Sequence, residues 1–598
     1  MSNDVTTTDG GAPMTPPTNR RRALWVATGV AGLTGVVGLA ALGGLAARDN
    51  KSDDAQRASE NHVAAPQNVS DAGTTEDETG KDADEKGGTD ADEQNRLDQY
   101  GRDGKGRDER GEHGRDKDRD RDEHGRVREV PCDDEKLIEA VDLANRDHGG
   151  TLKLAPHCTY ELSFSDRKAG AALPTIRQEI TIKGEDSTIK RDSEDAFRLF
   201  RVADGGDLTL KDVTLKGGNA AEFKYGQAPS TSTQGGQNLQ APQGGQGGAA
   251  AQGGPGGPGQ RKDGEADGGA LLVEHGGSAH LEKVKLVDNN AEGNGGAIAN
   301  YGRVDLAWST VADNHARESG GGIFNAGLLK VKESHVAHNT AVKNGGGIAN
   351  GHGRKYGYPH VVIDGRDQAG SVEIFKSTIE GNQAGDNGGG VFSSGGFVKI
   401  AFGAVVENTA CRNGGGIYAE DTDLDLEKVI VAKNHADKDG GGIVNTGGEK
   451  KKDGPSYDGA GKEQEATATI ADSRIVDNTA GRFGGGIFNG DLEVKLQDGF
   501  LQAPDGGDRK GDNATLTLRD TEIKGNTALN GGGIFNNKGT VTLTKTRVTK
   551  NTATDSSKLH RVAGGILNND GRVKLDEKST VTDNDPTNCA GTVKDCFN

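Results

Sequence analysis

The sequence predicts an all-β fold, a right-handed parallel β-helix solenoid with an N-terminal capping helix, preceded by one hydrophobic helix and a disordered linker. One short phrase, in which Asn-x-Ala is followed by a turn and Gly-Gly-Gly-Ile-x-Asn, recurs through most of residues 131–598. The 598 residues include 96 glycines and only 4% aromatic residues. This composition suits a thin core inside many tight coils better than several globular cores.

Residues 1–22 form a polar N-terminus that ends in three consecutive arginines, and residues 23–47 are an uncharged stretch rich in Leu, Val, Ala and Gly. The stretch is long enough to span a membrane, and the arginines would hold the N-terminus in the cytoplasm. The small residues around Gly44 and Ala47 equally fit a cleaved signal, so anchor and signal both stay open. In either case the rest of the chain is secreted or faces outward, and only this segment meets the membrane.

Residues 48–130 are a mixture of acidic and basic residues with few apolar ones. Such a segment cannot bury enough surface to offset the entropy of ordering, so we predict a disordered charged linker. The formal net charge of −19, without a basic patch, also argues against a nucleic-acid partner.

The β-helix is expected to begin with a cap. Leu137, Ile138, Val141 and Ala144 share one face of a helix, and a strand over 151–154 follows it. This helix-then-strand entry resembles the N-terminal cap of the pectin-lyase-like β-helix superfamily, in which an amphipathic helix covers the open end of the first coil.

The five cysteines fit the same plan. A helix of ~15 residues and a returning strand of ~7 residues have nearly equal lengths, which brings Cys158 back beside Cys132. We therefore predict a Cys132–Cys158 disulfide, and a second one between Cys589 and Cys596 at the other end. Cys411 is left as an unpaired structural thiol.

One asparagine recurs ten times in the phrase, and five of the nine intervals are 25 or 26 residues. The third residue before it is nearly always Val or Ile, which places that residue inside the coil. A polar side chain in the same stacked position needs partners above and below, so we predict an asparagine ladder. Its members are Asn289, Asn314, Asn339, Asn382, Asn408, Asn434, Asn478, Asn526, Asn551 and Asn584.

The Gly-Gly-Ala-Ile at 295–298 and its Gly-Gly-Gly-Ile copies resemble the repeats of chlamydial polymorphic outer membrane proteins, over about residues 266–570. The resemblance implies a surface adhesin of β-helical type. The Phe-x-x-Asn box of that family is here Ile323-Phe324-Asn325, so the resemblance supports the fold more than the activity.

On a β-helix, a catalytic or metal-binding cluster is expected at the outward positions. Nine residues before successive ladder asparagines, charges of alternating sign give way to threonines, which predicts a structural surface column: Asp305, Lys330, Glu373, Lys399, Asp425, Thr469, Thr517 and Thr542. Asp421, Asp423 and Asp425 alternate onto one strand face and could form a calcium site, the alternative to an ordinary solvated strand face, which is favoured. Gly351-His352-Gly353 looks like a box of polygalacturonase-type hydrolases whose other boxes are missing. No catalytic residue, metal or cofactor is assigned.

Insertions at 351–370, 447–465 and 490–513 all follow Gly-Gly-Gly-Ile, so they stack on one edge, whereas the flexible insertion 222–265 falls elsewhere. We expect a monomer that binds a polysaccharide or another cell-surface ligand through this edge, as adhesins do. A lyase or glycoside hydrolase acting on an acidic polysaccharide and a passive envelope protein are the alternatives. The candidate binding residues are Arg354, Lys355, Tyr356, Tyr358, His360, Asp364, Arg366 and Tyr457.

Overall fold

The computed structural model describes residues 127–166, 170–221, 266–351, 369–447, 466–494, 496–497, 500–501, 514–555 and 561–596. All of them belong to one compact unit, Asp116–Asn598. The hydrophobic segment 23–47, residues 48–126 of the linker and the insertion 222–265 lie outside these residues, so their assignments stay predictions. The assignment of 127–130 to the disordered linker was wrong, because these four residues form a strand paired in parallel with residues 151–154. In the part of the chain that is described, no helix has the length and apolar character needed to cross a bilayer.

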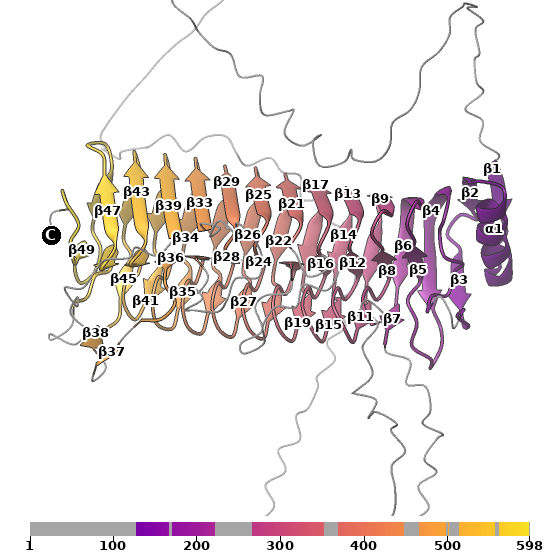
Figure 1. The fold of residues 1–598 in the computed structure, drawn as a ribbon, viewed down its shortest axis with the longest axis horizontal. Helices are drawn as coiled ribbons and strands as arrows, with labels where there is room; N and C mark the ends of the chain where they lie inside the picture. Colours follow the sequence, from indigo (N-terminus) through magenta and orange to yellow (C-terminus); the bar gives the residue numbers. More distant parts are fainter. Residues whose placement is uncertain are drawn as a thin grey trace, which may run out of the picture. The chain divides into compact units, whose positions relative to one another are not determined.

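The described residues form a right-handed parallel β-helix, as predicted, in which each coil adds strands to three parallel sheets (Figure 1). We call them the large, the small and the middle sheet, with 25, 10 and 12 strands among the described residues. Each regular coil runs from a pair of strands in the large sheet, through the small sheet, to the middle sheet.

The strands of the large sheet are β1 (Val127–Val130), β2 (Gly150–Leu154), β3 (Thr159–Leu162), β4 (Glu179–Arg191), β6 (Asp207–Lys216), β9 (Ser278–Glu282), β10 (Lys285–Val287), β13 (Arg303–Ala307), β14 (Thr310–Ala312), β17 (Leu328–Lys332), β18 (His335–Ala337), β21 (Ser371–Phe375), β22 (Thr378–Glu380), β25 (Phe397–Ala401), β26 (Ala404–Val406), β29 (Asp423–Glu427), β30 (Ile430–Ala432), β33 (Ala466–Ala471), β34 (Arg474–Val476), β39 (Ala514–Arg519), β40 (Glu522–Lys524), β43 (Thr540–Thr544), β44 (Arg547–Thr549), β47 (Arg572–Leu575) and β48 (Thr580–Thr582).

The strands of the small sheet are β7 (Asn219–Ala220), β11 (Asn290–Ala291), β15 (His315–Ala316), β19 (Thr340–Ala341), β23 (Gln383–Ala384), β27 (Thr409–Ala410), β31 (His435–Ala436), β35 (Thr479–Ala480), β41 (Thr527–Ala528) and β45 (Thr552–Ala553). The strands of the middle sheet are β5 (Phe200–Val202), β8 (Leu271–Val273), β12 (Ile298–Asn300), β16 (Ile323–Asn325), β20 (Ile348–Asn350), β24 (Val391–Ser394), β28 (Ile417–Glu420), β32 (Ile443–Thr446), β36 (Ile487–Gly490), β42 (Ile534–Asn537), β46 (Ile566–Asn569) and β49 (Cys589–Ala590). A short antiparallel pair, β37 (Leu496–Gln497) and β38 (Phe500–Leu501), stands apart.

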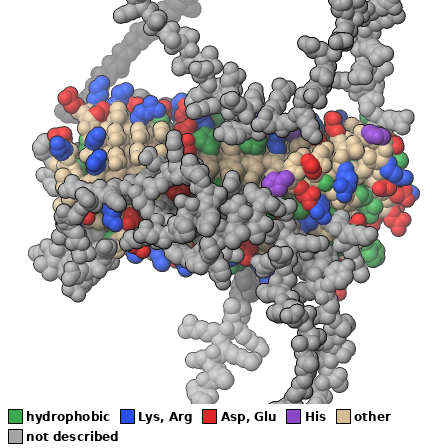
Figure 2. Space-filling view, viewed as in Figure 1, with side chains coloured by type: hydrophobic (Ala, Val, Ile, Leu, Met, Phe, Trp, Pro, Cys, Tyr) green, Lys and Arg blue, Asp and Glu red, His purple; other side chains and the backbone are tan. Residues whose placement is uncertain are grey.

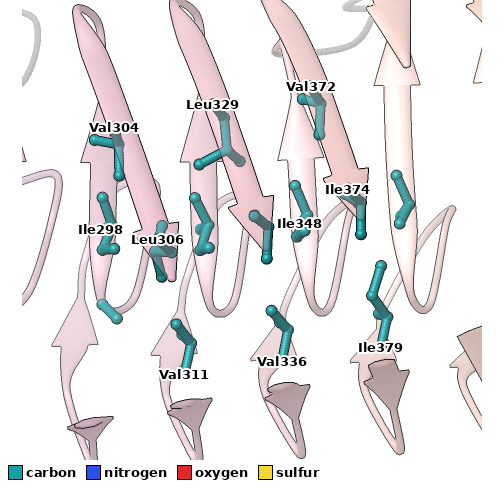
Figure 3. Packing of buried hydrophobic residues seen from close by; sticks show 14 of the residues in the cluster. Ile298, Val304, Leu306, Val311, Leu329, Val336, Ile348, Val372, Ile374 and Ile379 are labelled. Atoms are coloured by element: carbon teal, nitrogen blue, oxygen red, sulfur yellow. The ribbon is translucent and has the colours of Figure 1, made fainter. Parts of the chain in front are cut away.

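The core is a set of aliphatic files that run along the helix axis (Figure 3). Val304 is paired in register with Leu329, and Leu329 with Val372, so identical positions lie over one another in successive coils. These side chains are at most 1% exposed. Alternate residues of each strand point inward, and this produces the apolar-x-apolar pattern of the sequence.

At each position of the glycine triplet, the structure disfavours a side chain. Gly345 has a φ of +65°, a conformation that disfavours a side chain. A Cβ on Gly346 would lie 2.5 Å from the backbone of Gln383 in the next coil, and one on Gly347 would lie 2.7 Å from the oxygen of Gly390. The turn is therefore closed by backbone contact between coils, and larger residues would push the coils apart.

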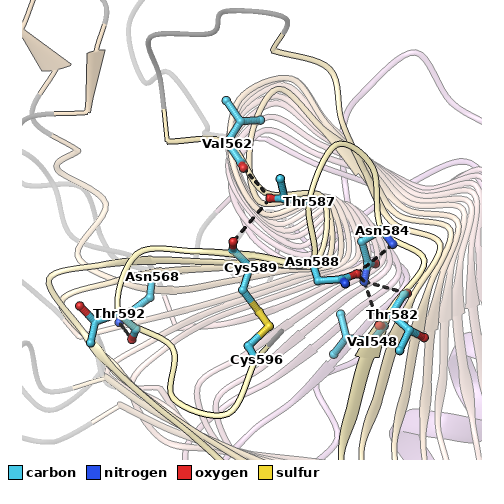
Figure 4. Close-up of a disulfide and its surroundings, with 10 residues drawn as sticks. All are labelled: Val548, Val562, Asn568, Thr582, Asn584, Thr587, Asn588, Cys589, Thr592 and Cys596. Carbon is cyan, nitrogen blue, oxygen red and sulfur yellow. Dashed lines mark hydrogen bonds between the residues drawn. A yellow bond between two sulfur atoms is a disulfide. The ribbon is translucent and has the colours of Figure 1, made fainter. Parts of the chain in front are cut away.

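Both ends are closed by the predicted disulfides. Helix α1 (Asp134–Arg146) is capped by Asp133, whose carboxylate accepts a hydrogen bond from the Lys136 backbone amide, and it buries Leu137, Val141 and Ala144. Cys132 and Cys158 form a disulfide beside it. At the other end, Cys589 and Cys596 are joined (Figure 4). Cys411 is a free, exposed thiol.

Candidate functional site: the insertion edge

The ten asparagines of the recurring phrase lie in a single buried file between the large and the small sheet. Each Nδ2 donates to the Oδ1 of the next asparagine at 2.9–3.0 Å, from Asn289 to Asn584. The same oxygens also accept the backbone amide of the preceding asparagine, as Asn339 does from Asn314 at 3.1 Å. This file fixes the register of the coils and has a structural rather than a binding role.

A second asparagine file, which we did not assign from the sequence, runs along the middle sheet. It contains the last residue of Gly-Gly-Gly-Ile-x-Asn, so the sequence signal was present. Nδ2 donates to the next Oδ1 at 2.7–2.8 Å within two runs: Asn300, Asn325 and Asn350, then Asn445, Asn489, Asn536 and Asn568.

These second-file asparagines also hold the turn that leads from the middle sheet to the large sheet. Asn300 donates to the carbonyl of Leu328 at 2.9 Å, and Asn536 donates to the carbonyl of Gly539 at 2.9 Å. We call this turn the insertion edge, because all three predicted insertions leave from it, after β20, β32 and β36. The turn keeps its bonds where an insertion interrupts it, since Asn350 donates to Gly370 at 3.0 Å.

The two ends of the first insertion are close together. A Cβ on Gly351 would lie 2.9 Å from the Cβ of Ala369, so residues 352–368 leave and re-enter the coil at one point. Asn339 and Asn382 are 43 residues apart in sequence, yet they are hydrogen-bonded neighbours. Removing the 17 residues 352–368 leaves 26, the length of an uninterrupted coil.

The start of the third insertion folds across the outer surface of the middle sheet. Lys538 pairs with Asp491 at 2.8 Å, and Leu492 and Val494 pack against an aromatic cluster. In that cluster Phe392 stacks on Tyr418 at 5.4 Å between ring centroids, and Phe488 stacks on Phe535 at 5.3 Å. The start of the third insertion therefore covers the outer surface of the middle sheet around Phe488.

A buried polar network connects Tyr301, on the insertion edge, with residues that precede the middle-sheet strands β5, β8 and β12. Arg198 is 2% exposed and Asp267 is 5% exposed. The Tyr301 hydroxyl donates to Asp267 Oδ2 at 2.5 Å, and the Asn294 amide donates to Oδ1 at 2.6 Å. Burial lowers the pKa of the Arg198 guanidinium to about 10, and Asp267 opposes that shift. Arg198 thus stays charged at neutral pH.

The network reaches solvent through residues of the same turn. The ring of His275, which is exposed, lies 5.8 Å from the ring of Tyr301. Nε of Arg201 donates to Glu274 at 2.9 Å. A phenol held by a carboxylate beside an accessible imidazole is an arrangement that can donate or accept protons.

The predicted binding residues fall within 352–368 and 448–465, outside the described residues, so whether they converge stays a prediction. They are Arg354, Lys355, Tyr356, Tyr358, His360, Asp364, Arg366 and Tyr457. His352 and Gly353 of the hydrolase-like box lie there too.

The acidic residues of the calcium alternative face other groups. Asp423 accepts the hydroxyl of Thr467 at 2.7 Å, and Asp425 pairs with Lys399 at 3.0 Å. Lys330 pairs with Glu373 at 3.2 Å in the same column, whereas Asp305 pairs with Arg303 in its own strand and with His280. Within the described ranges, no group of three or more His, Cys, Asp or Glu residues could hold a metal ion.

The large sheet carries exposed aromatic residues that the sequence analysis did not single out. Trp308 is 50% exposed, Phe402 44% and Phe375 36%. Figure 2 shows hydrophobic side chains gathered near the middle of this face, over β13 to β25 and beside the acidic side chains of β29. The signal in the sequence was an aromatic at positions where other coils carry Asp, Lys or Glu.

Comparison with known proteins finds no matching protein-family model and no matching curated protein. Among solved structures, the chain is similar to the A-module of mannuronan C-5 epimerase AlgE6 of Azotobacter vinelandii, at 12% identity and a TM-score of 0.36 over 78% of this chain and 98% of that chain. PfbA, a surface adhesin of Streptococcus pneumoniae, matches at 11% identity and a TM-score of 0.26, over 74% and 89% of the two chains. A PL6 family polysaccharide lyase from Pseudopedobacter saltans matches at 12% and 0.20, over 77% and 93%.

These likenesses concern the parallel β-helix fold alone. The predicted resemblance to chlamydial repeats stays a prediction, because none of the matches bears on it.

Proposed function

We propose that this protein is an exported or membrane-anchored surface β-helix that binds a polysaccharide through loops carried on the insertion edge. The proposal rests on one observation, which is that the turn at the insertion edge keeps its hydrogen bonds where an insertion interrupts it. Asn350 bonds across it where the first insertion leaves, and the ends of that insertion meet at Gly351 and Ala369. An edge of constant geometry that tolerates insertions is a rigid support for variable binding loops.

The covalent chemistry supports an exported location. Disulfides close both ends of the β-helix, Cys132–Cys158 and Cys589–Cys596. Such bonds persist in oxidising surroundings outside the cytoplasm. Together with the hydrophobic segment 23–47, they favour a protein that works outside the cell membrane.

The test is to excise the insertions one at a time. Removal of 352–368 or of 448–465 restores a coil of ordinary length, so both variants should fold with an unchanged far-UV circular dichroism spectrum. We expect at least a tenfold loss of binding to the bound polymer in a panel of acidic and neutral polysaccharides. Excision of 222–265 is the matched control, because that insertion follows the small sheet and not the insertion edge.

Unchanged binding after both excisions would refute the edge as the binding site, and a wild type that binds no polymer of the panel would favour a passive envelope protein. If excision of 352–368 weakens binding, substitution of Tyr356 or Tyr358 by Ala shows whether ring stacking within the first insertion contributes to the affinity.

A second candidate function is a lyase or glycoside hydrolase acting on an acidic polysaccharide. The pairing of Tyr301 with Asp267 next to His275 favours it, because these groups can move protons at the edge. Release of unsaturated or reducing ends from polyuronates, lost in Tyr301→Phe or in His352→Ala and Asp364→Ala, would establish it. No product from any polymer in the panel would dismiss it.

A further inference from the structure

The exposed aromatic residues of the large sheet occupy two neighbouring columns along the helix axis. Trp308 and Phe402 follow the last residues of β13 and β25, and Phe375 is the last residue of β21. In register, Phe375 is paired with Ala401 in the next coil. The rings of Phe375 and Phe402 meet edge to face at 5.5 Å between centroids. The three rings thus lie in two adjacent columns of one face, with Phe375 and Phe402 in contact and Trp308 two coils before Phe375.

Each of these rings has a lysine ammonium beside it. Lys332 lies 5.6 Å from the Trp308 ring centroid, Lys376 lies 5.3 Å from that of Phe375, and Lys428 lies 4.9 Å from that of Phe402. We call these six residues the aromatic–lysine strip. The coil between Trp308 and Phe375 has Glu333 at the bend instead of a ring; Glu333 accepts a hydrogen bond from Trp308 Nε1 and pairs with Lys376 at 3.8 Å. Each of the three ring–lysine pairs offers an apolar platform beside a positive charge.

Trp308 and Phe402 sit in a backbone conformation that bulky residues rarely adopt. Their φ angles are +50° and +55°. Every neighbouring coil has the same bend, with Lys283, Glu333, Lys376, Lys428 or Asp472 at it. The bend therefore does not require an aromatic ring, and an exposed ring there is disfavoured both by its backbone and by its contact with water. A function that needs the ring explains its presence.

The outward charge is positive on the three coils in the middle of the strip, in contrast to the chain, whereas β13 at one end of the strip carries one cation and one anion, Arg303 and Asp305. The outward positions of β17, β21 and β25, with the residue after each strand, hold four lysines and two glutamates: Lys330, Lys332, Lys376, Lys399, Glu333 and Glu373. The chain as a whole has a formal net charge of −19. The next coil is acidic, because β29 places Asp423, Asp425 and Glu427 outward, and Lys428, the last lysine of the strip, pairs with Glu427 at 3.0 Å.

We propose that the aromatic–lysine strip is a second binding surface, for a linear polysaccharide that carries carboxylate groups and lies along the helix axis. Pyranose rings stack on Trp308, Phe375 and Phe402, and their carboxylates meet Lys332 and Lys376. Coils are spaced by about 4.8 Å, so the three coil steps from Trp308 to Phe402 cover about 14 Å, the length of a few sugar units. The strip lies on the large sheet, so it is separate from the insertion edge and goes beyond the proposed function.

The test uses the full-length protein with polygalacturonate, alginate and fully methyl-esterified polygalacturonate as probes. We expect wild type to bind the two polyuronates at least tenfold more tightly than the ester, and to lose affinity as salt is raised. Trp308→Asn with Phe402→Asn should weaken binding at least tenfold, because asparagine keeps the bend without a ring. Lys332→Gln with Lys376→Gln should weaken only the polyuronates, towards the level of the ester.

Phe164→Asn is the matched control, since Phe164 is 84% exposed and lies outside the strip. It should bind as wild type does. The chain has two tryptophans, Trp25 and Trp308. The fluorescence change on adding polyuronate should therefore disappear in Trp308→Asn. The melting temperature of the Asn double variant should be unchanged or higher, which a purely structural role of the rings would not produce.

Equal binding of wild type and the Asn double variant would overturn the proposal, as would a lack of binding to either polyuronate or equally tight binding of the ester. Self-association that Trp308→Asn abolishes, without polyuronate binding, would assign the strip to a second copy of the chain instead. Excision of 352–368 and of 448–465 separates the two proposals, because binding through the strip should survive it.

Discussion

Ala419 lies opposite Asn445 in the parallel register of the middle sheet, at a position where asparagines in other coils donate to the next one along. The Oδ1 of Asn445 is buried and has no hydrogen-bond partner among the described residues. Ala419 therefore interrupts the second asparagine file, and the interruption leaves an acceptor without a donor.

Ala419→Asn should repair this break. The new Nδ2 would reach Asn445 Oδ1, as Asn445 reaches Asn489 at 2.8 Å. Satisfying a buried acceptor should raise the free energy of unfolding by about 1–2 kcal/mol. Urea denaturation followed by circular dichroism measures the change.

The matched control is Ala349→Asn, in the same sheet and equally buried. Ala349 belongs to the aromatic cluster on the outer surface of the sheet, so an amide there would be buried without a partner. We expect destabilisation by at least about 1 kcal/mol. If Ala419→Asn also lowers the urea midpoint, the missing donor at position 419 does not limit the stability of the second file.

Asn408→Ala should be among the most damaging single substitutions in the β-helix. Asn408 donates to Asn434 and to the Ile379 carbonyl, both at 3.0 Å, and accepts two hydrogen bonds from Asn382. Removing the side chain takes the acceptor from the buried backbone amide of Asn382 and a donor from the Ile379 carbonyl, while Asn434 Oδ1 keeps only the Asn408 backbone amide. This should cost about 2–4 kcal/mol.

Asn584→Ala provides the comparison for this substitution. Asn584 is the last member of the file and is 8% exposed, so water can replace part of what it loses. A smaller shift in the urea midpoint is expected there. Equal shifts at Asn408 and Asn584 would contradict the idea that the file is stabilised by burial.

The sequence was informative where one residue type recurs in phase. The Asn-x-Ala phrase was enough to predict the coil, and the lengths of helix and strand were enough to predict the Cys132–Cys158 disulfide, because both depend on local geometry. The file through Asn445 was missed although seven asparagines recur in it, in two runs. Its asparagines had been treated as part of the glycine turn.

The candidate binding surfaces were less predictable, because they depend on departures from the repeat. Trp308 and Phe402 are single exceptions in a column that otherwise holds charged residues, and a pattern search averages such exceptions away. Their ring–lysine pairs join residues from different coils, as Lys332 does with Trp308. Only the coil register brings such residues together.

Asp439→Asn should stabilise the protein at neutral pH. Burial raises the pKa of the Asp439 carboxyl, and the hydrogen bond from Arg482 opposes this shift. The side chain of Asp439 is 1% exposed and that of Arg482 is 41% exposed, so Arg482 remains solvated when the carboxylate is removed. The new amide can donate to Asn413, as Asn413 donates to Asn387 at 3.0 Å. A gain of about 1 kcal/mol is expected.

The pH dependence of this variant has a definite sign. Because the folded pKa of Asp439 lies above its unfolded value, the folded state binds more protons between the two values. The wild type should therefore lose stability relative to Asp439→Asn as pH rises from the usual range of an aspartate through the raised pKa, and the difference should be constant above it. Urea midpoints at several pH values measure this. A difference that shrinks with rising pH would show that the pairing with Arg482 outweighs burial.

The two disulfides should contribute unequally. Cys132 and Cys158 are 26 residues apart, whereas Cys589 and Cys596 are 7 apart. The chain-entropy relation gives about 3.5 kcal/mol for the longer loop and about 2.5 kcal/mol for the shorter one. Replacing Cys132 and Cys158 by Ala should also loosen α1 over the first coil, because helix and disulfide close the same end. Hydrogen exchange should then increase first in α1 and β2, while the coils around Asn408 stay protected. Uniform loss of protection along the whole solenoid would mean that the coils unfold as one unit and that the cap only sets their common stability.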